Sequence, residues 1–240
     1  MTLRSLFASN SPEKPYRMMT LLRLATFVLL AAPLTLPAQV KPGELDMALR
    51  QMDAASTKFK SAEADFQWDF YELVVKETTT QHGSIYFKKN GGKLEMGAKI
   101  QPPGAKFLAY KDGKLALFDP GTKELKLLSA GQNKARFESF LTLGFGGGGT
   151  DLAKAWDITK VGDEQLSDGS NNVQTAKLNL IPKDPDVKNM FTHVLIWVDL
   201  NRGISLKQQF FTPSGDYRTA IYTNIRYNQP VNTKNYEYKK

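Results

Sequence analysis

The stretch SAEADFQWDFYELVVKETTT, residues 61–80, decides the fold class. Its apolar residues Ala62, Ala64, Phe66, Trp68 and Phe70 alternate with charged and amide side chains. Alternation with a period of two predicts a β-strand that has one buried face. We therefore interpret this stretch as the first strand of a sheet with an apolar side.

The residues that follow repeat the pattern between turn signals. SIYFKK (84–89) places Ile85, Phe87 and Lys89 on one side, and LEMGAKI (94–100) places Leu94 and Met96 on one side. The sequence predicts tight turns at 81–83 (QHG), 90–92 (NGG), 112–113 (DG) and 119–121 (DPG). Strands joined by such short turns are antiparallel, so we expect a meander of five strands within residues 61–128.

Residues 157–238 return to strand patterns after an interruption. Their turns are predicted at 167–169 (SDG), 201–203 (NRG) and 213–216 (PSGD), and a short last strand is expected at 235–238. The total is about ten or eleven strands, and an antiparallel sheet of that size curls instead of staying flat.

Three segments are predicted to be helical. In LDMALRQMDAASTKFK (45–60), apolar residues such as Leu45, Leu49 and Met52 fall on one helical face. NKARFESFLTLGF (133–145) predicts a short and very apolar helix, and Thr150-Asp151 is expected to cap a second short helix, DLAKAW.

These elements together predict a mainly β (α+β) fold. We expect a single curved antiparallel sheet of about 10–11 strands that forms an incomplete barrel, covered by the N-terminal helix and by a short helical lid. The lid side chains are Phe137, Phe140, Leu141 and Phe145.

A glycine run, GFGGGG (144–149), lies between the last two predicted helices and matches the pattern G-x-G-x-x-G. A dinucleotide site requires a strand before that pattern and a long helix after it, and neither is predicted here. A P-loop is excluded because no lysine follows the last glycine. The run is interpreted as a flexible connector or, more specifically, as a hinge for the lid at Gly146, Gly147, Gly148 and Gly149; a backbone anion nest is a third interpretation.

Residues 1–38 are interpreted as a secretory signal, with Met18 or Met19 as the true start. The apolar run from Leu24 to Ala32 follows Arg17 and Arg23 and is short for a membrane span, although an uncleaved anchor is the alternative. The chain has no cysteine, which suits an exported protein of the bacterial periplasm that has no disulfide. Residues 39–240 are then one domain, which we expect to be monomeric.

Charge and chemistry-bearing residues exclude several function classes. Residues 1–38 hold four basic residues and one acidic residue, or +3, so the remainder of the +8 chain carries +5. This charge is spread along the sequence, which disfavours nucleic acid as a partner. With two histidines and no cysteine, metal ligation and thiol catalysis have few candidate residues. We predict neither a metal nor a cofactor, and no enzymatic activity.

The order of several short motifs resembles the LolA family of periplasmic lipoprotein carriers. The resemblance covers nearly all of residues 39–240 and rests on the pattern F-x-x-A-x-x-x-F-Q (59–67), GSIYFKK (83–89), QP (101–102), KDGK (111–114), FDP (118–120), LIPK (180–183) and LIWVD (195–199). Proteobacterial members have an arginine-proline pair where this chain has Lys89-Asn90, so the charge is kept and the planar guanidinium is not.

The resemblance implies a soluble carrier. It implies an incomplete barrel whose apolar cavity takes lipoprotein acyl chains, handed from an inner-membrane release complex to an outer-membrane receptor. Lys89 corresponds to the family's lid-holding arginine, so a lid latch or rim position is expected for it. The alternative is a strand-end lysine in solvent.

The apolar strand faces supply the residues expected to line the cavity. They are Phe66, Trp68, Phe70, Ile85, Phe87, Leu94, Met96 and Ile196. The alternative for each is an ordinary place in the core. Two other functions stay open beside the carrier: an envelope module with the same fold that senses or binds lipids or lipoproteins, and a structural envelope protein whose cavity is filled.

Overall fold

The computed structural model describes residues 43–129 and 143–238, and it contains one open antiparallel sheet of eleven strands. The helices are α1 (Glu44–Lys58), α3 (Gly149–Ala155), α4 (Pro185–Met190) and the 3-10 helix η2 (Thr233–Tyr236). The strands are β1 (Ser61–Glu72), β2 (Glu77–Asn90), β3 (Lys93–Ile100), β4 (Lys106–Lys111), β5 (Lys114–Asp119), β6 (Glu124–Ser129), β7 (Trp156–Ser167), β8 (Asn172–Pro182), β9 (His193–Asp199), β10 (Ile204–Phe211) and β11 (Tyr217–Tyr227).

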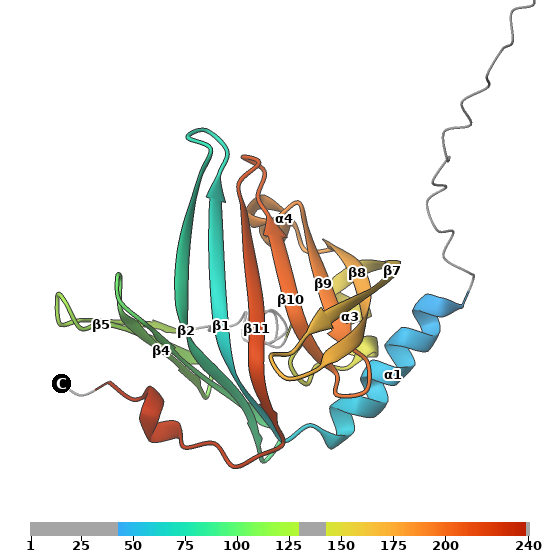
Figure 1. The fold of residues 1–240 in the computed structure, drawn as a ribbon, viewed down its shortest axis with the longest axis horizontal. Coiled ribbons are helices and arrows are strands. Elements are labelled where there is room, and N and C mark those ends of the chain that lie inside the picture. Colours follow the sequence, from blue (N-terminus) through green and yellow to red (C-terminus); the bar gives the residue numbers. More distant parts are fainter. Residues whose placement is uncertain (1–42, 130–142, 239–240) are drawn as a thin grey trace, which may run out of the picture. The chain divides into compact units, whose positions relative to one another are not determined.

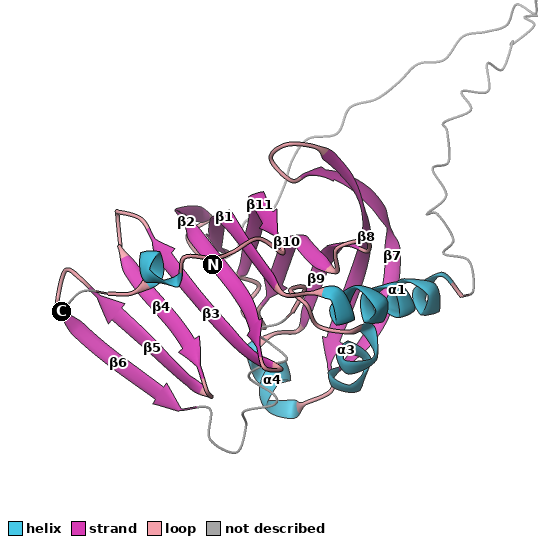
Figure 2. Cartoon of the chain, turned by 90° about the horizontal axis from the view of Figure 1, so that it is seen from below, coloured by secondary structure: helices cyan, strands magenta, loops and turns pink. Residues whose placement is uncertain are grey.

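The strand order is β6-β5-β4-β3-β2-β1-β11-β10-β9-β8-β7, so two meanders meet where the first strand pairs with the last. In that central pair, Trp68 lies opposite Ala220 and Phe70 lies opposite Arg218. Figure 1 shows the long strands β2, β1, β11 and β10 side by side, and Figure 2 shows β4–β6 at one end of the sheet and the arching β7–β8 hairpin at the other. The predicted curved, unclosed sheet with about eleven strands is confirmed.

One face of the sheet carries most of the core, and we call it the inner face, marked by Phe66, Phe87 and Ile196. Register places alternate apolar residues of neighbouring strands there, as in the row Ala64, Ile85 and Ala98. Helix α1 packs on this face through Met52, and α3 does so through Leu152. The predicted N-terminal helix therefore covers the sheet.

Two predicted turns form as expected because their chemistry is local. Gly91 and Gly92 between β2 and β3 have φ of 55° and 80°, and Asp112 and Gly113 between β4 and β5 have φ of 50° and 79°. Positive φ at both central residues is typical of the type I′ turns that match the twist of antiparallel strands.

The predicted turn at 81–83 is wrong, since these residues lie inside β2 and the hairpin turns at 73–76 instead. Gly83 pairs with Phe66, and a Cβ on Gly83 would come within 2.5 Å of the Phe66 ring and 2.3 Å of the Lys99 carbonyl oxygen. Glycine is therefore required there for close approach of neighbouring groups and not for a turn.

Three further local predictions are corrected. Residues 235–238 form no strand; Tyr236 in η2 packs edge-on against Tyr86 at 4.8 Å on the other face of the sheet. Helix α3 is not capped by Thr150-Asp151 but begins after Gly148. Helix α4 is absent from the sequence prediction, although Asp184 accepts hydrogen bonds from two of its N–H groups and Pro185 follows, which is a common helix start.

Candidate functional site

The predicted lining residues do lie on one face, but they fall into different packing environments. Phe66, Ile85, Phe87 and Met96 belong to a cluster formed by β1–β4 and β11, with Trp68 packed against it. Ile196 belongs to a second cluster, with Val194 and Leu178, beneath α1 and α3. Leu94 is buried on β3, whereas Phe70 is 38% exposed. The inner face is thus closed near its centre and open toward Phe70.

Phe145 closes the centre of the inner face. Its ring stacks on Phe87 at 4.2 Å and meets Tyr222 edge-on at 4.9 Å, and the residue is only 1% exposed. The sequence predicts Phe145 at the end of a lid helix; instead it forms an isolated β-bridge with Ile204. The lid residues Phe137, Phe140 and Leu141 lie outside the described residues.

The segment that carries this ring, residues 143–148, is hydrogen-bonded to β10 and to the turn before it. Ser205 N–H donates to the Gly144 carbonyl at 2.5 Å, and Gly146 N–H donates to the Gly203 carbonyl at 3.3 Å. The Gln208 amide donates to the Leu143 carbonyl. Gly144 has φ +79°, and a Cβ there would lie 1.8 Å from the Ser205 hydroxyl. The glycine run predicts flexibility, whereas the described part of this segment is closely packed.

The glycines after Phe145 also pack closely, against α1. A Cβ on Gly146 would lie 2.3 Å from the Phe59 ring, and one on Gly148 would lie 2.6 Å from Asp53 Oδ1. A Cβ on Gly149 would meet the Leu49 backbone at 2.2 Å. A hinge at Gly146–Gly149 stays a prediction, and close packing is a second reason for glycine in this run.

Lys89 joins three elements on the inner face. Its ammonium donates to the Gly146 carbonyl at 2.8 Å and to the Ser56 carbonyl of α1 at 3.3 Å, and it lies 5.8 Å from the Phe59 ring. Burial lowers the pKa of Lys89, and the charge of Asp151 opposes that shift. A latch or rim role for Lys89 stays a prediction, but its half-buried side chain contacts both covers of the sheet, α1 and the 143–148 segment.

Asp53 provides a second link between the covers. Its carboxylate accepts from Thr150 N–H at 3.0 Å and from the Thr150 hydroxyl at 2.6 Å. The carboxylate of α1 thus occupies the N-terminal end of α3, where unpaired N–H groups favour negative charge. Sequence reasoning missed this contact because the two residues are far apart in the chain.

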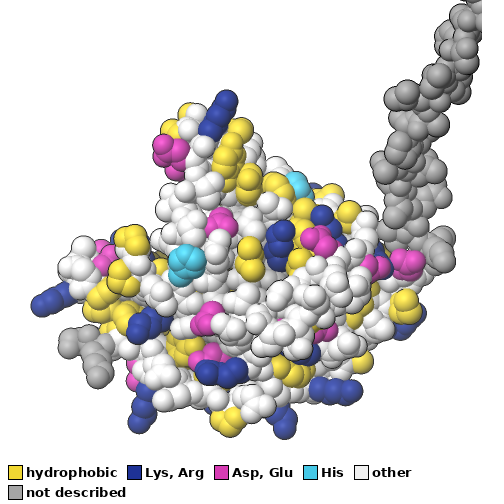
Figure 3. All heavy atoms as spheres, viewed as in Figure 1, with side chains coloured by type: hydrophobic (Ala, Val, Ile, Leu, Met, Phe, Trp, Pro, Cys, Tyr) yellow, Lys and Arg dark blue, Asp and Glu magenta, His cyan; other side chains and the backbone are white. Residues whose placement is uncertain are grey.

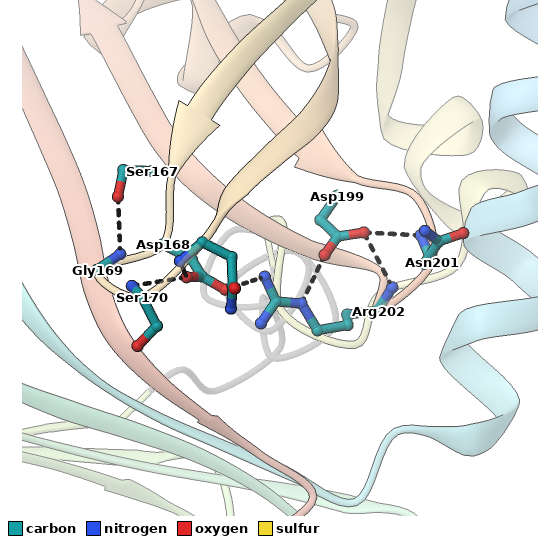
Figure 4. Close-up of polar contacts among 8 residues, drawn as sticks. Ser167, Asp168, Gly169, Ser170, Asp199, Asn201 and Arg202 are labelled. Carbon is teal, nitrogen blue, oxygen red and sulfur yellow. Dashed lines mark hydrogen bonds and ion pairs between the residues drawn. The ribbon is translucent and has the colours of Figure 1, made fainter.

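A polar cluster fixes the turns at one end of the sheet (Figure 4). Arg202 donates to Asp168 at 2.9 Å and to Asp199 at 2.5 Å, and Asn224 N–H donates to the Asp168 carbonyl at 2.8 Å. Burial raises the pKa of Asp168, but hydrogen bonds from Asn171, Ser170 and Arg202 outweigh it and bring that pKa below its usual value. The cluster ties the β7–β8 turn to the β9–β10 turn and to β11.

Several solved structures have a similar fold. No family model matches the chain, and no curated protein matches it. A chain of the Pseudomonas aeruginosa MucA/MucB complex matches 81% of this chain and 61% of its own length, with TM-score 0.52 and 14% identity. An uncharacterised conserved protein from Thermus thermophilus matches 81% of this chain and 94% of its own, with TM-score 0.50 and 10% identity.

A LolA superfamily protein from Nitrosomonas europaea also matches, over 81% of this chain and 97% of its own, with TM-score 0.39 and 14% identity. The open antiparallel sheet is a fold similar to that of the MucA/MucB chain and of the Thermus thermophilus protein. At identities of 10–14% these likenesses describe the fold alone.

Other chemistry is sparse in the described part of the chain. No group of three or more histidine, aspartate or glutamate side chains there could hold a metal ion, and no helix there is long and apolar enough to cross a bilayer. His193 stacks on Phe211 at 4.2 Å, and burial lowers its pKa. Figure 3 shows basic and acidic side chains interspersed over the face in view.

Proposed function

We propose that residues 39–240 form a periplasmic carrier that binds the acyl chains of lipoproteins or lipids on the inner face of the sheet. In this proposal residues 1–38 direct export, and the carrier moves its cargo from the inner to the outer membrane. It receives cargo from an inner-membrane release complex and delivers it to an outer-membrane receptor. The motif resemblance to the LolA family supports these partners.

One observation carries the proposal. The space beside Phe87 and Tyr222, which we call the seat of Phe145, is filled by the Phe145 ring, and this ring comes from a segment outside the named strands. Burying one phenylalanine side chain contributes about 1.5–3 kcal/mol. Burying a sixteen-carbon acyl chain contributes on the order of 12 kcal/mol, at ~0.8 kcal/mol for each methylene. An acyl chain that is buried along its whole length on the inner face therefore displaces this ring favourably, provided that moving the 143–148 segment costs less than the difference.

The first test is native mass spectrometry of the mature protein purified from its own periplasm, followed by organic extraction. A bound mass that extracts as lipid, or an acylated protein that co-purifies, supports the carrier and names its cargo. A bare protein that also takes up no fluorescent fatty acid contradicts it, because the inner face would then be a permanently filled core.

A binding or sensing module is the second candidate, favoured by the likeness to a chain that forms a complex with another protein, the MucA/MucB complex. The two functions differ in what happens to the bound lipid. A carrier releases a labelled acyl ligand to acceptor vesicles or an outer-membrane receptor, whereas a sensor keeps the ligand and changes its affinity for a protein. Transfer that is no faster than spontaneous ligand loss favours the sensor.

A further inference from the structure

Arg218 lies where the inner face passes from closed to open. It belongs to β11, opposite Phe70 of β1 and Phe210 of β10. Its guanidinium lies 5.3 Å from the Trp68 ring and 5.2 Å from the Phe210 ring. The cation is thus held between two aromatic faces, on the same side of the sheet as the predicted lining residues.

No carboxylate pairs with this cation among the residues that the structure describes. Nearby carboxylates in the sequence are engaged elsewhere: Asp69 accepts from Gln67 and Thr80, and Asp216 accepts from Leu73 N–H and Ser214. Burial lowers the pKa of Arg218, as expected for a charge that has lost part of its water. Arg218 is only partly exposed, and charged side chains that lose hydration are ordinarily paired.

Along β1, the side chains near Arg218 change from buried to exposed, which suits a ligand with an apolar tail and a polar head. Trp68 stacks on Phe66 at 4.1 Å, and Phe66 is 3% exposed where Phe70 is 38% exposed. From Phe70 back to Ala62 the strand takes eight residue-to-residue steps, or roughly 26 Å of inner face at the usual rise of a strand. A tail that follows this row reaches the seat of Phe145, while its polar end stays beside Arg218.

We propose that Arg218 binds the anionic head of an acyl ligand, a carboxylate or a phosphate, whose tail lies along the inner face. The inference rests on the proposed acyl-binding function and narrows its ligand to an acidic amphiphile. A guanidinium suits this task because its planar donors match both carboxylate and phosphate oxygens. Trp68 and Phe210 keep the guanidinium in place without neutralising it.

The test compares head groups on one tail. Binding of hexadecanoic acid, hexadecan-1-ol and palmitoyl lysophosphatidic acid is measured by calorimetry at pH 8 for the wild type, Arg218→Gln and Arg218→Lys. The wild type is expected to prefer the acid over the alcohol by about tenfold, the worth of one charge-assisted hydrogen bond. Arg218→Gln removes that preference, and Arg218→Lys retains most of it.

Lys207→Gln is the matched control, because this substitution removes one positive charge from neighbouring β10. The Lys207 ammonium lies on the other face of the sheet, 4.4 Å from the centre of the Trp197 ring. Its head-group preference should equal that of the wild type. Whichever of carboxylate and phosphate binds more tightly identifies the fatty acid or the phospholipid as the source of the head.

The outcomes separate this inference from the proposed function. If the wild type binds acid and alcohol equally, or Arg218→Gln weakens both by the same factor, the head-group role is overturned while acyl binding stands. If the wild type binds none of the three ligands, both proposals fail.

Discussion

Replacing Lys89 by methionine keeps most of the unbranched side chain and removes its two hydrogen bonds, to the Gly146 and Ser56 carbonyls. Hydrogen bonds from a charged donor contribute about 1.5–3 kcal/mol each when well formed, and the longer of these two is weak. Because the ammonium also loses hydration in this place, we expect a net loss of about 2 kcal/mol for the closed arrangement.

That loss raises the population in which the 143–148 segment has left the sheet by roughly 30-fold. The assay is native-state hydrogen exchange at the amides of Ser205 and Gly146, whose hydrogen bonds to the Gly144 and Gly203 carbonyls break when the segment leaves. Both amides should exchange roughly 30-fold faster in Lys89→Met, while amides of the central β9–β10 pairing keep their rates.

Lys88→Met is the control, since Lys88 is next in the same strand and points to the other face. It should leave the Ser205 and Gly146 rates unchanged. If Lys89→Met also leaves them unchanged, Lys89 does not hold the segment, and the latch must be abandoned even if acyl binding is found.

Three further substitutions test the packing around the site. Phe145→Ala should lower the free energy of unfolding of the ligand-free protein by about 3–5 kcal/mol yet tighten binding of hexadecanoic acid, because the seat beside Phe87 is vacated; weaker acyl binding in calorimetry would show that Phe145 is core and not a displaceable cover. Gly149→Ala places a Cβ 2.2 Å from the Leu49 carbonyl oxygen and should lower the free energy of unfolding in urea by about 3 kcal/mol, the upper end for overpacking. Gly162→Ala is the control and should cost little, because a Cβ there has nothing within 4 Å. A stable Gly149→Ala protein that loads its acyl ligand slowly would instead favour the hinge. Asp168→Asn should lower the free energy of unfolding by about 2 kcal/mol at pH 7. The pKa of Asp168 lies lower in the folded than in the unfolded chain, so its stabilisation is fully present at pH values above the unfolded pKa and is lost as pH falls through the folded pKa. A difference in stability between Asp168→Asn and wild type that does not shrink in acid would contradict the assignment.

The architecture was predictable because its signals are local. Period-two alternation fixed which residues of β1, β2 and β3 share a face, and the Asn90-Gly91-Gly92 and Asp112-Gly113 turns follow from residues that tolerate positive φ. The turn predicted at Gly83 is wrong because glycine is typical both of turns and of close approach between strands. Only the pairing with Phe66 distinguishes the two cases.

The candidate site was predictable in part. Lys89 could be placed on the face of Ile85 and Phe87 from the sequence, but its acceptors on Gly146 and Ser56 could not, since they belong to distant segments. In the sequence, Arg218 is a single basic residue in a strand, and no pattern around it predicts a binding role. Its neighbours Trp68 and Phe210 come from two other strands, so the aromatic enclosure exists only after the sheet has formed.

The pairing of β1 with β11 has a consequence for how the chain reaches its native state. The centre of the sheet joins residues near the start of the domain to residues near its end, as in the pair Phe66 and Tyr222. Such non-local pairing slows folding, because a long loop must close before the contact forms. If the chain emerges amino end first, the β1–β6 meander has an unpaired β1 edge until β11 arrives. During that interval the edge is open to strand addition by other chains, so the yield of folded protein depends on how quickly β11 follows the β1–β6 meander.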